Sequence, residues 1–125
     1  MSVVIGAAPK TIVIANPNKP RRFSQGNLDA DGSEQILVEY TGVGKLYGTV
    51  DLHEMQIGDK VVLRQYIKLL PNSDFQKYAE ESYSGTQENP VVYFLEKATD
   101  VAIKITLQQT EGIFRSSEHN FMVED

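Results

Sequence analysis

The chain has 125 residues with a net charge of -5, and it contains no cysteine and no tryptophan. A chain of this length folds as one domain without cross-links, and the absence of cysteine excludes a disulfide framework, a thiolate zinc site and a cysteine nucleophile. No apolar run approaches the roughly 18 residues needed to span a bilayer, so we expect a soluble protein that does not bind a membrane.

Charge is distributed unevenly along the chain. Residues 1–28 contain four basic side chains and no acidic one, whereas residues 29–125 contain 8 basic and 17 acidic side chains. A cationic segment attached to an anionic body indicates that the segment has a partner of its own. The body itself would repel phosphates, so direct binding of nucleic acid is disfavoured.

Residues 1–28 are predicted to form an extended N-terminal arm. Two short β-prone runs, VVI and TIVIA, are followed by NPNKPRRFSQGN, whose proline and asparagine content prevents a continuous helix or central strand. Ordering this segment costs about 1–2 kcal/mol per residue in backbone entropy, so it needs a docking surface. That surface is either an edge strand of its own domain or a neighbouring subunit. The expected contact residues are Val3, Val4, Ile5, Thr11, Ile12, Val13, Ile14, Arg21, Arg22 and Phe23.

From residue 34 the chain alternates strand signals with turn signals. In EQILVEY (34–40), Ile36, Val38 and Tyr40 alternate with Gln35, Leu37 and Glu39. In KLYGTVDL (45–52), Leu46, Gly48, Val50 and Leu52 share one side. Each pattern predicts a strand with one buried face, because successive side chains of a strand point to opposite faces.

The segment 61–85, VVLRQYIKLLPNSDFQKYAEESYSG, has two interpretations. Ser73 followed by Gln76 forms a capping-box pattern that would open a helix, and Gly85 would end it. Alternatively, Pro71 occupies the second position of a turn, and the segment folds back as a β-hairpin. We favour the hairpin, because phenylalanine, tyrosine and serine are poor helix formers and a hairpin keeps the even spacing of strands.

The remaining strands are PVVYFLEK (90–97), VAIKITLQQT (101–110) and IFRSSEHNFMV (113–123). The second of these alternates most clearly, with Val101, Ile103, Ile105 and Leu107 expected inside and Ala102, Lys104, Thr106 and Gln108 expected in solvent. Turn clusters about 10–16 residues apart and no long helical period predict an all-β protein. We therefore expect an antiparallel β-sandwich over residues 29–125, jelly-roll or Ig-like, with about 7–8 strands.

One acidic cluster contains the ligand types of a calcium loop. Asp29, Asp31 and Glu34 surround Gly32, but a strand begins almost at once and no helices flank the loop. An Asp-Gly turn leading into that strand explains the cluster better.

A second cluster would suit a transition metal. Asp51 and His53 share a face if they lie in a strand, and Glu118 and His119 would complete a site only if the two strands paired. Because polar side chains at strand ends are common, we expect no metal ion and no cofactor.

The sequence contains no pattern that indicates catalysis. There is no Gly-x-Ser-x-Gly elbow and no phosphate-binding glycine-rich loop, and the acids Glu80 and Glu81 are typical of a solvated strand face. We therefore expect no catalytic residue, no small-molecule substrate and no enzymatic activity.

Tyrosines form a candidate exposed aromatic face. Tyr66, Tyr78, Tyr83 and Tyr93 would form a ladder beside glutamines if their strands were neighbours. Aromatic rings with amide side chains bind sugars and also form protein interfaces, although core packing with the hydroxyls at the rim is the simpler interpretation.

The blocks GTVDLHEMQIGDKVVLRQYIKLL, YAEESYSGTQENPVVYF and KITLQQTEGIFR resemble small β-sandwich proteins of tailed phages and related prokaryotic viruses. Those proteins are virion accessory proteins: capsid decoration (cement), turret or tail-associated subunits. The resemblance covers residues 34 to about 116 and lies in the rhythm of the strands. It implies a non-enzymatic virion protein on the capsid surface. Together with the composition and charge of residues 1–28, it leads us to expect a homo-oligomer that binds the major capsid protein or other virion subunits through its N-terminal arm. The alternative is a carbohydrate-binding module that uses the tyrosine face.

Overall fold

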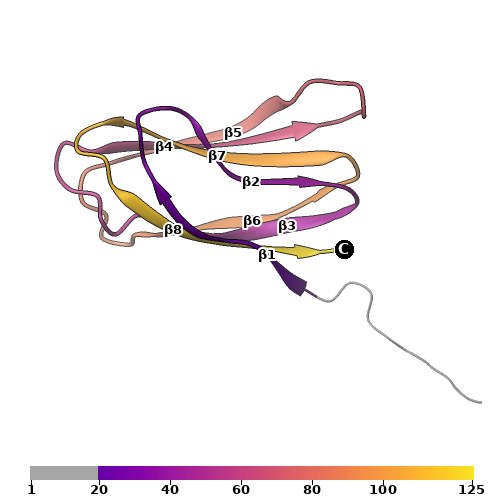
Figure 1. Ribbon diagram of the computed structural model, residues 1–125, viewed down its shortest axis with the longest axis horizontal. Helices are drawn as coiled ribbons and strands as arrows, with labels where there is room; N and C mark the ends of the chain where they lie inside the picture. The colour runs from indigo at the N-terminus through magenta and orange to yellow at the C-terminus, as the bar shows by residue number, and fades with distance from the viewer. Residues whose placement is uncertain (1–19) are drawn as a thin grey trace, which may run out of the picture.

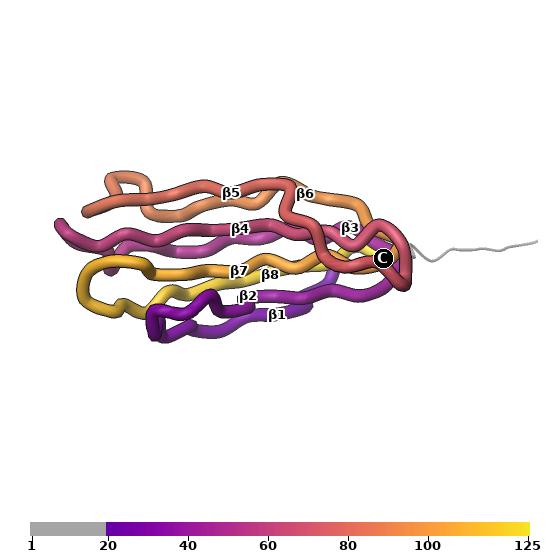
Figure 2. The backbone as a smooth tube through the Cα atoms, turned by 90° about the horizontal axis from the view of Figure 1, so that it is seen from above, coloured from indigo at the N-terminus to yellow at the C-terminus, as the bar shows by residue number. Residues whose placement is uncertain are grey.

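The computed structural model of the chain describes residues 20–125, which form eight strands in two stacked antiparallel sheets (Figures 1 and 2). Sheet A has the order β1 (Pro20–Asp29), β8 (Ser116–Glu124), β3 (Gly44–Asp51) and β6 (Val91–Thr99). Sheet B has the order β2 (Gln35–Thr41), β7 (Ala102–Glu111), β4 (Lys60–Lys68) and β5 (Gln76–Ser84). The predicted all-β sandwich is confirmed. Of the two architectures considered, the strand order is that of a jelly roll, because every connection except that between β4 and β5 crosses from one sheet to the other.

The segment 61–85 is the predicted hairpin. Strands β4 and β5 pair antiparallel with Arg64 opposite Glu80, and the turn between them is closed by a hydrogen bond from Ser73 N to Leu70 O (3.0 Å). The helical interpretation of this segment is wrong. The residues of β5 are weak helix formers, and pairing with β4 provides the backbone hydrogen bonds that a helix would otherwise have to supply.

Part of the expected arm belongs to the domain. Residues 20–29 pair with β8 along their length as the edge strand β1, so the boundary expected after residue 28 falls inside a strand. Pro20 is the first residue of β1, where the missing N–H costs no ladder bond, and Phe23 packs edge-on against Tyr40 at 5.2 Å. Of the expected arm contacts, Arg21, Arg22 and Phe23 lie in β1, whereas Val3, Val4, Ile5, Thr11, Ile12, Val13 and Ile14 lie outside the described residues.

Two of the predicted alternations need correction. A bulge in β2 turns both Leu37 and Val38 into the core and leaves Ile36 52% exposed. In β7 the outward face is not solvated, since Ala102 and Thr106 are buried. Strand β7 lies between β2 and β4 in sheet B, and on its outer face Thr106 donates a hydrogen bond to Glu34.

The core lies between the sheets and is apolar. Val50, Ile103 and Phe121 are fully buried, and the rings of Phe94 and Phe121 lie 5.5 Å apart. Gly48 is required where β3 pairs with β8, because a Cβ atom there would come within 2.4 Å of the backbone oxygen of Asn120. The face predicted for 45–52 is confirmed: Leu46, Gly48, Val50 and Leu52 all point inward and are buried.

Asp59 joins two loops at one end of the sandwich. Its carboxylate is buried and accepts hydrogen bonds from Gln56 N (2.9 Å), Ile113 N (3.0 Å) and Arg115 Nε (2.7 Å). Burial alone would raise the pKa of Asp59, but these hydrogen bonds and the Arg115 charge outweigh it and hold the pKa below its usual range. The β3–β4 and β7–β8 connections are therefore fixed to each other through one charged group.

Replacing Asp59 with alanine should destabilise the protein by about 3–5 kcal/mol, because Arg115 and two backbone donors lose their partner. Urea unfolding followed by circular dichroism measures the loss. Asp100→Ala, at an exposed turn, is the matched control and should change stability by less than about 0.5 kcal/mol. Equal effects of the two substitutions would contradict the assigned role of Asp59.

His119 should make stability depend on pH. It pairs with the fully buried Val50, its Nδ1 atom is buried with no hydrogen-bond partner among the described residues, and burial lowers its pKa. The unfolded chain then binds a proton at higher pH than the folded chain, so the contribution of His119 is fully present above about pH 6.5 and is lost as pH falls below it. His119→Leu should flatten the stability profile between about pH 7.5 and 5.5 relative to the wild type, which urea titrations at several pH values would measure.

Candidate interaction surface

The two long sides of the sandwich differ. Each side carries the edge strands of both sheets, β1 with β2 on one side and β5 with β6 on the other (Figure 2). The β1–β2 side is closed by the Phe23–Tyr40 ring contact and by a hydrogen bond from Ser24 Oγ to Leu37 O (3.5 Å). The β5–β6 side is open.

A groove of about 290 Å³ runs between the edges of β5 and β6. Its apolar part consists of Leu63, Ala79, Val92 and Phe94, and its polar part consists of Gln65, Glu80, Glu81, Tyr83 and Tyr93. Leu63 and Phe94 are core residues, so the groove opens directly onto the hydrophobic interior of the sandwich. We call this feature the β5–β6 groove.

Strand β6 forms an apolar edge beside this groove. Val91, Tyr93 and Leu95 are 59%, 58% and 77% exposed, and among the described residues no strand pairs with the outer side of β6. Leu52 N donates to Pro90 O (2.9 Å), so the backbone groups of residue 90 face β3. Because bonding direction alternates along an antiparallel strand, the groups of Val92 also face β3, and those of Val91 and Tyr93 face the open edge.

The sequence contains a signal for this exposed apolar edge that the prediction of strands did not recognise. The run PVVYFL (90–95) is apolar at consecutive positions, which is unusual for a strand with one solvated face. The neighbouring strand β5, by contrast, carries Lys77, Glu80 and Glu81, the charges with which natural proteins protect an edge.

The four expected tyrosines do not form one continuous face. Tyr83 and Tyr93 line the β5–β6 groove, and Tyr78 donates to Oε1 of Gln65, which also lines it (3.0 Å). Tyr66 lies on the outer face of sheet B, where its hydroxyl donates to Glu34. Three of the four side chains therefore lie on the open side of the sandwich. The fourth, Tyr66, belongs to a separate polar network on sheet B.

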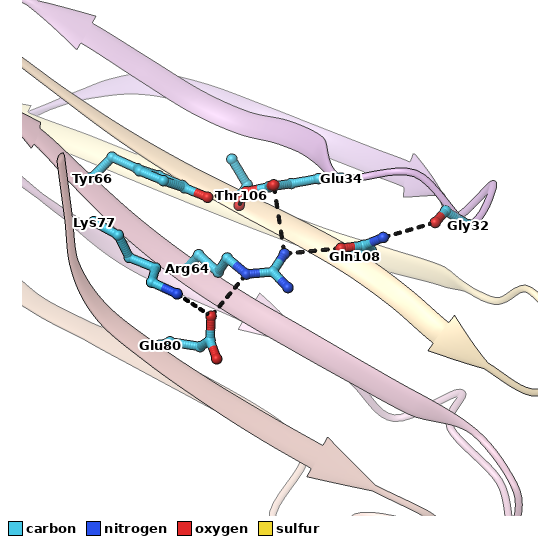
Figure 3. Close-up of polar contacts among 8 residues, drawn as sticks. All are labelled: Gly32, Glu34, Arg64, Tyr66, Lys77, Glu80, Thr106 and Gln108. Atoms are coloured by element: carbon cyan, nitrogen blue, oxygen red, sulfur yellow. Dashed lines mark hydrogen bonds and ion pairs between the residues drawn. The ribbon is translucent and has the colours of Figure 1, made fainter. Parts of the chain in front are cut away.

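That polar network is centred on Arg64 (Figure 3). Arg64 donates through Nε to Glu80 (2.9 Å) and through Nη1 to Gln108 (2.9 Å), and Gln108 in turn donates to Gly32 O (3.0 Å). Nη1 of Arg64 also lies 3.6 Å from Oε1 of Glu34. The network joins β4, β5 and β7 to the loop after β1, so we assign it a structural role.

Glu34 is the acidic centre of this network. Thr106 Oγ1 donates to it at 2.6 Å, and Tyr66 donates as well. Burial would raise the pKa of Glu34, but these hydrogen bonds and the charge of Arg64 lower it below its usual range. The ring of Tyr66 is covered by Lys104, whose Nζ lies 4.9 Å from the ring centroid.

The acidic cluster at 29–34 is the turn that the sequence favoured. Gly32 has a φ of 90°, and Asp31 Oδ1 accepts hydrogen bonds from the backbone (2.9 Å) and hydroxyl (2.6 Å) of Ser33. Asp29 accepts a hydrogen bond from Ser116 Oγ (2.5 Å), and Glu34 points into the Arg64 network, so the three carboxylates diverge.

The second candidate metal cluster is also divided. The two strands do pair, as β3 and β8, but His119 lies opposite the buried Val50, and Asp51 Oδ2 lies 2.8 Å from Nδ1 of His53. Asp51, Glu118 and His119 all line an open hollow of about 570 Å³ on sheet A, whereas His53 does not. Within residues 20–125 no group of three histidine or carboxylate side chains is placed to hold a metal ion.

No protein-family model and no curated protein matches the chain. Among solved structures, the chain is similar to the crystal structure of the infectious bursal disease virus VP2 subviral particle, with a TM-score of 0.44 and 16% sequence identity. The match covers 96% of this chain and 36% of that chain, so this chain spans about a third of the length of the protein it matches.

Replacing Arg64 with alanine should destabilise the protein by about 1–3 kcal/mol, because Glu34, Glu80 and Gln108 lose a shared donor in a half-buried position. Lys45→Ala is the control: Lys45 forms an exposed ion pair with Glu96 at 3.8 Å, and its loss should cost less than about 1 kcal/mol. Urea unfolding of both variants compares them, and an Arg64 variant as stable as the Lys45 variant would contradict the assignment.

Proposed function

We propose that this protein is a non-enzymatic structural subunit of a virion, a capsid decoration or cement protein. It binds the major capsid protein or other subunits through its N-terminal segment and the edges of its sandwich. The observation that carries the proposal is the open β5–β6 side, where an apolar edge strand lies beside a groove that reaches the core. A monomer that works alone protects such an edge, whereas a subunit of an assembly uses it.

Charge supports an assembly role. The N-terminal 28 residues carry only basic charges, and the rest of the chain has an excess of acidic side chains. Arg21 is held by Asp125 through Nη2 at 2.5 Å, whereas Arg22 is exposed on β1. A basic segment beside an acidic domain favours contact between the segment of one subunit and the body of the next.

The jelly-roll architecture is compatible with a virion role but does not by itself indicate one. Jelly rolls include viral capsid domains, lectins and cupins, and a fold alone does not determine a function. Here the space between the sheets is filled by apolar side chains such as Leu107 and Phe121. The surfaces available to a partner are therefore on the outside of the sandwich, where shell contacts form.

The direct test of the proposal is the protein composition of purified virus particles. Virus particles purified from the source of the sequence should contain this chain in a fixed ratio to the major capsid protein, measured by quantitative mass spectrometry. Its absence from purified particles would contradict the proposal.

Deleting residues 1–19 should leave a folded protein that no longer binds particles. All eight described strands remain in this variant, so its urea midpoint should match that of the full chain at concentrations where the full chain is monomeric. Deleting residues 1–28 would also remove most of β1 and expose β8, so it should lower stability and does not test binding separately. Co-sedimentation with particles that lack the protein measures binding, and a 1–19 deletion variant that still binds normally would show that the segment is dispensable.

A carbohydrate-binding role is the alternative, and one observation favours it. Tyr78, Tyr83 and Tyr93 gather with Gln65 on the open side, a combination that suits a sugar ring and its hydroxyls. In this case the isolated protein should bind an oligosaccharide in a glycan array, and Tyr83→Ala should abolish the signal. A virion subunit that uses the same side for protein contacts should give no signal.

A further inference from the structure

We infer that the outer edge of β6 in one copy accepts the segment Thr11–Ala15 of a second copy as an additional strand of sheet A. The inference rests on the proposed function, since it identifies the surface that the N-terminal segment binds. It depends on four properties of the described residues: free backbone groups, an apolar lining, complementary charge, and the distance from β1.

Of the four edge strands, β6 is the one suited to strand addition. Val91 and Tyr93 direct their backbone groups outward, and their side chains are exposed and apolar. Strand β5 is protected by the charged side chains Lys77, Glu80 and Glu81, and the edges of β1 and β2 are joined by the Phe23–Tyr40 contact. The bulge opposite Leu46 and Gly48 ends the regular part of β6 near Leu95, which leaves an edge about five residues long.

The segment matches this edge in length and in side chains. TIVIA is five residues of high β propensity, and alternate residues of an added strand point to opposite faces. Ile12 and Ile14 on one face would cover the mouth of the β5–β6 groove, whose inner wall is Leu63, Val92 and Phe94. Val13 on the other face would extend the exposed apolar row of β6.

Charge adds specificity to the match. Residues 1–19 contain Lys10 and Lys19 and no acidic side chain. Glu80 and Glu81 line the groove, and Glu80 is already paired with Arg64 and Lys77 (2.9 and 2.8 Å), which leaves Glu81 for Lys10, next to the added strand.

The distance between β1 and the outer edge of β6 indicates that the added segment comes from a second copy of the chain. Strand β1, to which the segment is attached, lies at the opposite edge of sheet A from β6. A strand added outside β6 would lie four strand spacings from β1, about 19 Å even in a straight line that crosses the end of the sheet. The link from Ala15 to Pro20, five Cα–Cα steps, reaches about 17 Å when fully extended. The segment of one molecule therefore falls short of its own β6 edge, and a neighbour must supply it.

Three full-length variants test the inference. Tyr93→Pro removes the N–H that points to the open edge and leaves the β3–β6 ladder intact, and Tyr93→Thr is its control, because it removes the ring and keeps the N–H. Ile12→Pro/Val13→Pro disables the donor segment in either register, because successive N–H groups point opposite ways. Urea unfolding first verifies that each variant is folded, and Val91→Pro replaces Tyr93→Pro if the latter is not.

Light scattering over a concentration series then gives the solution mass. Wild type should associate as concentration rises, and Tyr93→Thr should do so more weakly, because it loses part of the apolar row and keeps the N–H. Association should be roughly tenfold or more weaker in Tyr93→Pro than in Tyr93→Thr, and in the donor variant than in wild type. A one-to-one mixture of the two proline variants should form a heterodimer, because one supplies an intact edge and the other an intact segment.

Three results would overturn the inference: a monomeric wild type, association of the donor variant as strong as wild type, or a mixture that does not combine. The second result is expected if two β6 edges pair with each other or if the segment returns to its own β1. These results leave the proposed function open to its own test, since the presence of the chain in purified particles does not depend on which surface joins its copies.

Discussion

Two stacked antiparallel sheets have four edge strands, and each edge carries backbone groups that need a partner or water. In this protein the four edge strands differ in the side chains that cover them. The pair formed by β1 and β2 is closed by an aromatic contact, β5 is covered with charges, and β6 is apolar with its backbone groups turned outward. This asymmetry leaves one side of the domain open, and the proposed function rests on it more than on any single residue.

Local signals were sufficient for most of the fold. The turn at Pro71 and the strand-forming residues on both sides of it identified the β4–β5 hairpin, and the alternation of 45–52 identified the buried face of β3. What the sequence could not give was position within a sheet. The alternation of β7 predicts a solvated outer face, but Thr106 is buried because β7 is flanked by β2 and β4, and that arrangement is decided by pairing between distant segments.

The domain boundary expected after residue 28 lies inside β1, and it was misplaced for a related reason. Residues 20–29 are polar and contain a proline, so their composition is that of an arm, yet β8 provides a ladder that such residues can join at an edge. The candidate surface was only partly visible in the sequence. The tyrosines were recognised as a group, but Tyr66 belongs to the Arg64 network and the other three meet because β5 stacks over β6, which no sequence spacing encodes.

The pairing of β1 with β8 also constrains how the molecule is made. On the ribosome, the first strand of sheet A emerges long before its only described partner, so it must wait while the strands between them are translated. Of the six strand pairs, only β4 with β5 joins neighbours in the chain, and contacts between distant segments fold slowly because the loop must close before they form. The hairpin is therefore the natural nucleus, and sheet A is completed last. Until β8 is made, β1 and the β8-facing edge of β3 lack their partner, and during this interval wrong pairings between newly made chains compete with the right one.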